Sequence, residues 1–280
     1  MKSSFYLKLI GLFFPIFFVN SDIQADESVD QVPYKTVLEY PFRQADKKLF
    51  YGEDALQFIE AWTIETGKAG SGSHNGDIIF IHGGCWLSAY DIAHSRAFTS
   101  ALADTGYRVW SLEYRRTGDE EGGWPESFFD IQQAINYLQD EQGITLSETV
   151  IMGHSAGGHL ALLAGQNGHR FKAVVGLAAI VDLEAYALGE NSCQSATAMF
   201  MGDLPSEAPA LYRAANPKSQ PMPANTTLIF SQQDGIVPAS QVDGVQAVQL
   251  LELQEAGHFD FIYPKSKAWQ VIQDTLKSLD

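Results

Sequence analysis

The stretch Thr149-Val150-Ile151-Met152-Gly153-His154-Ser155-Ala156-Gly157-Gly158 joins a short apolar strand to a serine flanked by glycines. Residues 158–165 continue it as a helix-compatible run. A serine on such a strand-to-helix turn has a strained backbone and an exposed hydroxyl, and small neighbours let helix and strand approach closely. Without the strand and the helix, Gly-x-Ser-x-Gly would fit any glycine-rich turn. In this context, the pattern predicts that Ser155 is a nucleophile.

Apolar strands and helix-compatible segments alternate on either side of this stretch. The continuous apolar runs at 78–81 and 173–178 are typical of strands covered on both faces. Further strands are predicted at 107–114, 149–152, 227–231 and 250–254, and helices at 95–105, 125–142 and 265–279. This alternation predicts an α/β fold with a mostly parallel central sheet and helices on both faces.

Other segments interrupt or precede the alternation. Residues 34–40 and 56–64 are predicted to be strands that begin the sheet in antiparallel fashion. The glycine-rich residues 67–76 indicate a flexible loop rather than a linker between domains. Residues 182–223 form a long segment of small and polar residues, in which we expect short helices over the active site. Residues 238–249 leave room for about two helical turns at most.

The N-terminus has the pattern of a secretory signal peptide. Lys2 and Lys8 give it a basic start, residues 9–19 are largely apolar, and Ala25 offers a small residue for cleavage. The apolar run is short for a transmembrane helix. We therefore expect a periplasmic or secreted protein that loses residues 1–25 and has no stable membrane insertion afterwards. An uncleaved anchor is the alternative.

The composition fits one domain over residues 26–280. Hydrophobic residues make up 45% of the 280, enough for a sizeable core, and the net charge of −16 argues against nucleic acid and anionic membranes as partners. The two cysteines, Cys85 and Cys193, fit either one disulfide in an oxidising compartment or two buried thiols. The histidines show no metal-ligand spacing, so we expect no metal site.

Asp234 and His258 supply the groups that would activate Ser155. A serine hydroxyl needs a base to take its proton, and the base needs an acid to orient it. Asp234 follows the strand at 227–231, and His258 follows the strand at 250–254. Both lie at carboxyl ends of strands, where parallel sheets place their sites. Asp182, which follows another strand, is the rival acid.

The loop His82-Gly83-Gly84-Cys85-Trp86 follows the strand at 78–81 and is the predicted oxyanion loop. Its glycines let the backbone aim N–H groups at a substrate. We expect the donors to be the N–H of Ala156 together with that of Gly84 or Cys85. His82 is expected to form structural hydrogen bonds.

Three aromatic residues, Trp86, Tyr90 and Trp124, lie in loops near the expected site. We predict that they line an aromatic or sugar-binding pocket, and ordinary core packing is the alternative. Arg115 and Arg116 follow a strand, and structural ion pairs are expected for them rather than contacts with an acidic substrate.

Taken together, these motifs resemble the α/β-hydrolase esterases. The likeness runs from about residue 51 to the C-terminus and rests on the oxyanion loop, the serine motif, Glu113-Tyr114-Arg115-Arg116, Gly123-Trp124-Pro125 and Gly257-His258-Phe259-Asp260. The nearest branch is that of the small esterases around the bifunctional feruloyl/acetyl-xylan type and kynurenine formamidase. The resemblance implies a cofactor-free serine hydrolase with Ser155, Asp234 and His258 as its triad. The loop departs from the His-Gly-Gly-Gly of the hormone-sensitive-lipase group and is closer to the His-Gly-Gly-x-Trp of the formamidases.

Three functions follow from these patterns. The leading hypothesis is a carboxylic-ester hydrolase that forms an acyl-enzyme on Ser155. The second is an arylformamidase that cleaves an N-formyl amide, against which the export signal argues. The third is a non-catalytic binding protein on a hydrolase scaffold. In the first two cases the partner is a small ester or amide, and the sequence identifies neither the acyl group, the alcohol nor the oligomeric state.

Overall fold

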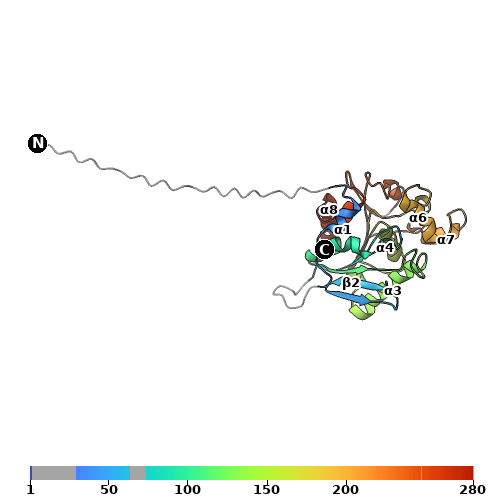
Figure 1. Ribbon diagram of the computed structural model, residues 1–280, viewed down its shortest axis with the longest axis horizontal. Helices are drawn as coiled ribbons and strands as arrows, with labels where there is room; N and C mark the ends of the chain where they lie inside the picture. Colours follow the sequence, from blue (N-terminus) through green and yellow to red (C-terminus); the bar gives the residue numbers. More distant parts are fainter. Residues whose placement is uncertain (2–29, 64–73, 247, 280) are drawn as a thin grey trace.

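An eight-stranded sheet forms the centre of the computed structural model, which describes residues 1, 30–63, 74–246 and 248–279 (Figure 1). The strand order is β1-β2-β4-β3-β5-β6-β7-β8. The strands are β1 Lys47–Phe50, β2 Phe58–Trp62, β3 Asp77–Ile81, β4 Arg108–Leu112, β5 Thr149–His154, β6 Ala173–Leu177, β7 Thr226–Ser231 and β8 Gln249–Leu253. Pairing is parallel from β4 to β8 and antiparallel between β1, β2 and β4. The prediction of a mostly parallel sheet is confirmed.

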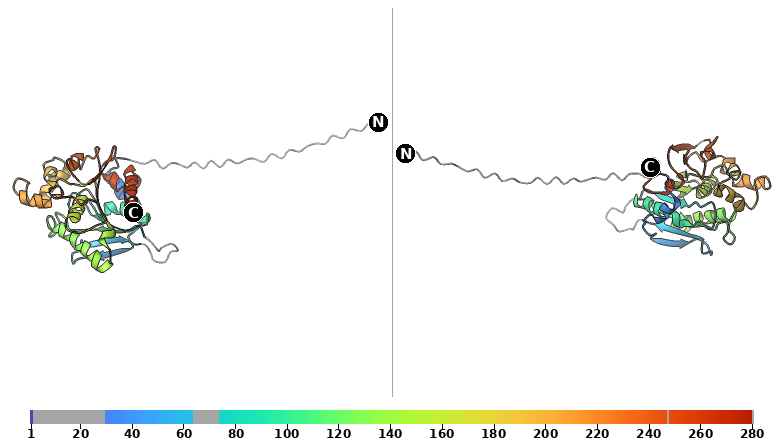
Figure 2. Two further views of the ribbon diagram at one scale, coloured as in Figure 1. Left: turned by 180° about the vertical axis from the view of Figure 1, so that it is seen from behind. Right: turned by 45° about the horizontal axis from the view of Figure 1, so that its top comes forward.

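Helices cover both faces of the sheet (Figures 1 and 2). One face is covered by α2 Arg96–Asp104 and α8 Lys267–Lys277, with the short α1 Tyr34–Glu39 beside them. The other is covered by α3 Glu126–Gln142 and α4 Ala156–Gln166. The long segment after β6 contains α5 Leu183–Tyr186, α6 Ser192–Met201 and α7 Pro209–Ala215, which confirms the short helices expected there. Helices α6 and α7 lie at the opposite end of the molecule from α8 and α1.

Alternation along the central strands divides the apolar core in two. In β3, Ile79 and Ile81 pack into the core on the α3–α4 side, whereas Ile78 and Phe80 pack into the core on the α2–α8 side. All four side chains are fully buried. Each contributes roughly 1.5–3 kcal/mol by leaving water. The continuous apolar run of this strand is therefore the consequence of having helices on both faces.

The strand predicted at 34–40 is wrong, since this segment forms helix α1 after Pro33. Its tyrosines, threonine and valine favour strands. No strand pairs with it, however, and Val37 is buried in the core beside α8. Strand β1 was not predicted, because it is an edge strand with mostly exposed residues and a weak apolar pattern.

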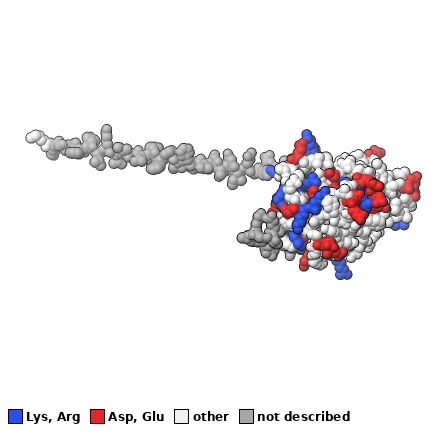
Figure 3. Space-filling view, turned by 60° about the horizontal axis from the view of Figure 1, so that its bottom comes forward, with Lys and Arg blue, Asp and Glu red and all other residues white. Residues whose placement is uncertain are grey.

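Two further sequence predictions fall on other parts of the chain. The signal peptide at 1–25 and most of the glycine-rich loop at 67–76 lie outside the described residues. In the described part of residues 238–249, the 3₁₀ turn η4 Ala239–Val242 precedes β8, in agreement with the short span expected. None of the helices in the described part of the chain combines the length and apolarity needed to cross a membrane. On the face seen in Figure 3, Lys and Arg side chains lie beside Asp and Glu side chains and form no broad basic surface.

Candidate active site

Ser155 lies in a strained turn between β5 and α4. Its backbone has φ 56° and ψ −121°, a conformation that residues other than glycine rarely adopt. The turn is packed tightly: a Cβ at Gly153 would lie 2.2 Å from the carbonyl oxygen of Gly157, and a Cβ at Gly157 would lie 2.2 Å from that of Ile81. Only glycine fits at both positions without a shift of backbone. The strand–turn–helix expected around Ser155 is confirmed.

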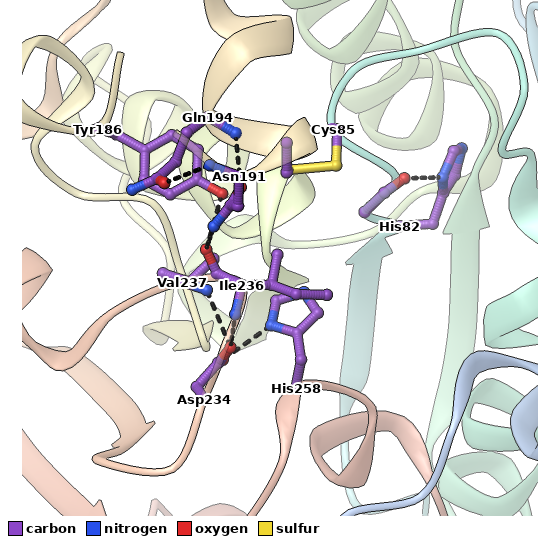
Figure 4. Close-up of a disulfide and its surroundings, with 11 residues drawn as sticks. His82, Cys85, Tyr186, Asn191, Gln194, Asp234, Ile236, Val237 and His258 are labelled. Atoms are coloured by element: carbon purple, nitrogen blue, oxygen red, sulfur yellow. Dashed lines mark hydrogen bonds and ion pairs between the residues drawn. A yellow bond between two sulfur atoms is a disulfide. The ribbon is translucent and has the colours of Figure 1, made fainter. Parts of the chain in front are cut away.

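Asp234 and His258 form a buried hydrogen-bonded pair (Figure 4). The Nδ1 atom of His258 lies 2.7 Å from Oδ2 of Asp234. The other carboxylate oxygen accepts hydrogen bonds from the N–H groups of Ile236 at 2.8 Å and Val237 at 2.9 Å. The carboxylate therefore has a fixed orientation and accepts the proton on Nδ1, which leaves Nε2 of the neutral ring as an acceptor.

Ser155 and His258 line the same pocket, which has a volume of about 190 Å³. Gly84, Cys85 and Tyr90 also line it. The rival acid Asp182 is elsewhere, since it caps helix α5 and lies 3.0 Å from the ammonium of Lys218. The structure thus brings Asp234 to His258 and leaves Asp182 outside the pocket.

His154 connects the serine turn to the loop of His258. Its Nε2 atom lies 2.9 Å from the carbonyl oxygen of His258, and the two ring centroids are 4.6 Å apart. Burial and the neighbouring His258 hold the pKa of His154 well below its usual value, so the ring is neutral and donates from Nε2. The sequence gave no sign of this hydrogen bond, because its two residues are 104 positions apart.

Asp260 holds the loop of His258 from the other side. One of its carboxylate oxygens accepts hydrogen bonds from the N–H groups of Gln31 and Gly257, and the other accepts one from Val32 at 2.8 Å. Burial raises the pKa of Asp260, although these N–H groups act in the opposite direction. Next to it, Lys267 pairs with Asp30 at 2.7 Å. The start of the described chain is thereby tied to the turn η5 His258–Ile262.

The predicted oxyanion loop has an unusual backbone. Gly84, Cys85 and Trp86 have φ values of 108°, 53° and 56°. The carbonyl of Gly84 accepts from Leu87 N–H at 3.0 Å, and that of Trp86 accepts from Thr117 N–H at 2.8 Å. The loop lies close to the serine, because a Cβ at the preceding glycine would be 3.1 Å from Cβ of Ser155. Ala156, the third expected donor, is the first residue of α4.

Below the loop, His82 is part of a buried polar network. Its Nδ1 atom lies 2.8 Å from the carbonyl oxygen of Gly83, and its Nε2 atom lies 2.9 Å from Oε1 of Glu113. Arg116 reaches the same carboxylate at 3.1 Å. Burial raises the pKa of Glu113, but His82 and Arg116 lower it more, so that its pKa is below the usual value. The structural roles expected for His82 and Arg116 are confirmed, and Arg115 likewise forms an ion pair, with Asp130 at 2.7 Å.

The prediction that Trp86 and Trp124 line the pocket is wrong. The ring of Trp86 is fully buried and stacks on Phe200 of α6, with centroids 4.7 Å apart and planes at 9°. The ring of Trp124 stacks on Phe128 of α3 at 5.7 Å. Neither is among the residues that line the pocket, whereas Tyr90 is.

Two aromatic residues that were not predicted to contact the substrate, Tyr34 and Phe259, form a wall of this pocket together with Tyr90. Tyr34 of α1 lies edge-on to Tyr90 with centroids 5.6 Å apart, and lies 5.3 Å from Phe259. His94 lies behind Tyr34 and also lines the pocket, and burial together with the nearby His82 lowers the pKa of His94 to about 3. Phe259 follows His258 directly, so proximity to the base was a usable signal for it. Tyr34 gave no local signal, because its helix precedes the alternating part of the chain.

Cys85 and Cys193 form a disulfide, which decides between the two alternatives left open by the sequence. Their Cα atoms are 5.1 Å apart and their positions differ by 108 residues. The bond joins the predicted oxyanion loop to α6 beside the pocket (Figure 4).

Within the described residues, no cluster of three or more His, Cys, Asp or Glu has an arrangement that fits a metal ion.

Known proteins share this architecture. Esterase B of Lactobacillus rhamnosis superposes with a TM-score of 0.70 at 18% identity, over 88% of this chain and 89% of that one. A truncated carbohydrate esterase from gut microbiota gives a TM-score of 0.67 at 20% identity, over 86% and 98%. At these identities the likeness shows the α/β-hydrolase fold.

Sequence relatives give a narrower assignment. Esterase LipC of Mycobacterium tuberculosis (strain ATCC 25618 / H37Rv) is 29% identical over 122 residues, which are 42% of this chain and 29% of the length of that esterase. The chain thus spans less than a third of this curated relative. Residues 68–248, more than half of the chain, match the BD-FAE family. The protein therefore belongs to the BD-FAE family, on an α/β-hydrolase fold.

Proposed function

We propose that the protein hydrolyses carboxylic esters through an acyl-enzyme on Ser155. The observation that carries this proposal is the buried Asp234–His258 pair in the pocket that also contains Ser155 on its strained turn. An orienting acid, a histidine base and a serine at a strand-to-helix turn are the three parts that nucleophilic catalysis by serine requires.

The geometry suggests the following steps. Nε2 of His258 takes the proton of the Ser155 hydroxyl as its oxygen attacks the acyl carbon. The N–H of Ala156, together with that of Gly84 or Cys85, stabilises the oxyanion of the tetrahedral intermediate. His258 then protonates the leaving alcohol, and in the second half of the cycle it takes a proton from the water that releases the acid. Asp234 holds the tautomer and the orientation of the ring throughout.

For the substrate we propose acetyl or feruloyl esters of carbohydrates. Three observations support this class: membership of the BD-FAE family, the likeness to a carbohydrate esterase, and the aromatic wall of Tyr34, Tyr90 and Phe259 on a small pocket. A wall of this kind packs well against a planar acyl group. The N-formyl amide alternative rests on the sequence resemblance of the loop, and Trp86 of that loop packs in the core rather than in the pocket.

A fluorophosphonate probe tests the catalytic proposal. We expect covalent labelling of Ser155, located by mass spectrometry of the labelled peptide, and turnover of a short-chain aryl ester. Ser155→Ala should abolish both while circular dichroism stays unchanged. Ser195→Ala, an exposed serine on α6, is the matched control and should retain both. A folded wild-type protein that neither reacts with the probe nor hydrolyses any ester would favour the binding-protein alternative. Parallel assays with acetyl and feruloyl esters and N-formylkynurenine then separate the substrate classes.

We also propose that the protein is exported. The N-terminal pattern supports this location, and so does the disulfide, since such bonds persist mainly in oxidising compartments. The intact mass of the protein from fractionated cells tests it. A mature chain that begins near residue 26 and lies outside the cytosol is expected, and a full-length cytosolic chain would contradict the proposal.

A further inference from the structure

We propose that the Cys85–Cys193 disulfide is a positioning element of the active site, through which the start of α6 holds the oxyanion loop in register with the loop of Asp234. The inference rests on the proposed function, because it assigns a catalytic consequence to the loop of Gly84 and Cys85.

The oxyanion loop requires support from outside itself. Three consecutive residues, Gly84, Cys85 and Trp86, have left-handed backbone, and two of them carry side chains that disfavour it. Both of these side chains are anchored on α6: Cys85 by the disulfide to Cys193, and Trp86 by the stack on Phe200. Cys193 and Phe200 are seven positions apart in the helix, or about two turns, and so share one face. One face of α6 therefore holds the strained part of the loop.

The first turn of α6 also reaches the loop of the catalytic acid. Asn191 caps the helix by accepting from Gln194 N–H at 2.9 Å, and its Nδ2 donates to the carbonyl oxygen of Ile236 at 2.9 Å (Figure 4). The Tyr186 hydroxyl donates to the same carbonyl at 3.1 Å, and Ile236 N–H donates to Asp234 at 2.8 Å. Only one residue, Ser192, lies between Asn191, which contacts the acid loop, and Cys193 of the disulfide. The start of α6 therefore connects both halves of the site.

Loss of the disulfide would release the covalent connection of Cys85 to this helix. N–H donors of an oxyanion hole act on charge that develops in the transition state, so their displacement lowers kcat rather than raising KM. In the two-electron reduction, a dithiol reagent transfers its electrons to the S–S bond and becomes a cyclic disulfide. Cys85 and Cys193 take up two protons as thiols. Activity should thus depend on the redox state of a bond that takes no part in the chemistry.

Cys193→Ala is the sharpest test, because it removes the bond and leaves every residue of the oxyanion loop unchanged. We expect kcat for a short-chain aryl ester to fall by about 10- to 100-fold, a part of the effect of deleting one oxyanion donor, with KM within about threefold of wild type. Met199→Ala, on the exposed side of the same helix, is the control and should keep the wild-type kcat. A kcat within about twofold of wild type in Cys193→Ala, or a loss confined to KM, would overturn the inference.

Reduction of the wild-type protein by dithiothreitol is the second arm and decides the matter if Cys193→Ala does not fold. Free thiols are counted by alkylation and mass spectrometry, and the fold is followed by circular dichroism. Activity should fall in proportion to the reduced fraction while the fold persists, and it should return on reoxidation. Full activity of the reduced protein, or global unfolding on reduction, would contradict a positioning role. An oxidised wild-type protein with no esterase activity would instead refute the proposed function itself.

Discussion

Replacing Gly157 by alanine tests how closely the helix behind Ser155 must approach the neighbouring strand. The new Cβ would lie 2.2 Å from the carbonyl oxygen of Ile81 and 2.3 Å from that of His82, where ordinary contact begins at 3.4 Å. Both oxygens belong to backbone at the end of β3, so neither can rotate away. Relief requires α4 and the start of the oxyanion loop to move apart by about 1 Å, which is the size of the overlap.

The expected change in the free energy of unfolding on Gly157→Ala is the balance of two effects. In an unobstructed helix, alanine stabilises relative to glycine by up to about 1 kcal/mol. Overpacking a well-packed interior costs typically about 1–3 kcal/mol and occasionally more. Because Gly157 meets two backbone oxygens at once, we expect the upper part of this range to prevail. With the gain from alanine subtracted, Gly157→Ala should lower the free energy of unfolding by about 1–3 kcal/mol.

Urea denaturation followed by circular dichroism measures this loss, with Gly165→Ala as the matched control. Gly165 also lies in α4, but its Cβ would meet a side-chain atom, Cγ2 of Val174, at 2.7 Å. Val174 is buried and β-branched and adjusts only in part, so we expect the control to lose stability, but less than Gly157→Ala, whose neighbours are backbone oxygens. Gly157→Ala should also react more slowly with a fluorophosphonate, since the oxyanion loop shifts away from the serine. If Gly157→Ala were as stable as the control, the close approach would be wrong.

Three other changes give independent tests. Asp234→Asn should lower kcat by about 10⁴-fold without unfolding, because the amide favours the wrong tautomer of the catalytic imidazole, and an unchanged kcat would exclude Asp234 as the acid. Asp260→Asn should cost about 2–3 kcal/mol in the urea assay, since an NH₂ group would face backbone N–H donors, and an unchanged urea midpoint would contradict this. Burial lowers the pKa of His94 to about 3, that of His159 to about 4 and that of His154 well below 6.5, so their contribution to stability is complete above pH 6.5. As the pH falls below 6.5, this contribution to the free energy of unfolding should be lost by up to about 1.4 kcal/mol per pH unit for each ring. His159→Asn should make the free energy of unfolding fall less steeply with pH, and an equal slope in the variant would refute a buried neutral His159.

The positions of Ser155, Asp234 and His258 were predictable because each follows a strand with a strong local pattern. In a parallel sheet the carboxyl ends of strands share one edge, so residues that are distant in sequence meet there. The structure places Ser155 and His258 in one pocket and pairs Asp234 with His258. The common direction of the strands, and the position of each residue just after one of them, were therefore enough to predict where these residues meet. No knowledge of the helices was needed.

The errors concern side chains whose direction depends on distant elements. Trp86 follows the oxyanion glycines, but the ring points to Phe200 of α6, more than a hundred positions later, and nothing near Trp86 indicates this. The pairing of Cys85 with Cys193 is hidden in the same way, since both cysteines approach each other only once α6 has packed. Tyr34 reaches the pocket because the short helix α1 packs against the turn η5, whereas strand propensity gave the opposite prediction. Local pattern thus located the proposed reacting groups better than the side chains that form the walls of the pocket.

How far the N-terminus can be shortened depends on contacts near His258 that are made by Asp30, Gln31 and Val32. Removal of residues 1–25, as expected for an exported protein, would keep all of these ties. A recombinant version that starts after residue 32 would deprive the carboxylate of Asp260 of two N–H donors. It would also deprive Lys267 of Asp30, one of its ionic partners, near the proposed catalytic base. The choice of the first residue, or of a tag placed there, is therefore a choice about the base loop and not about a dispensable tail.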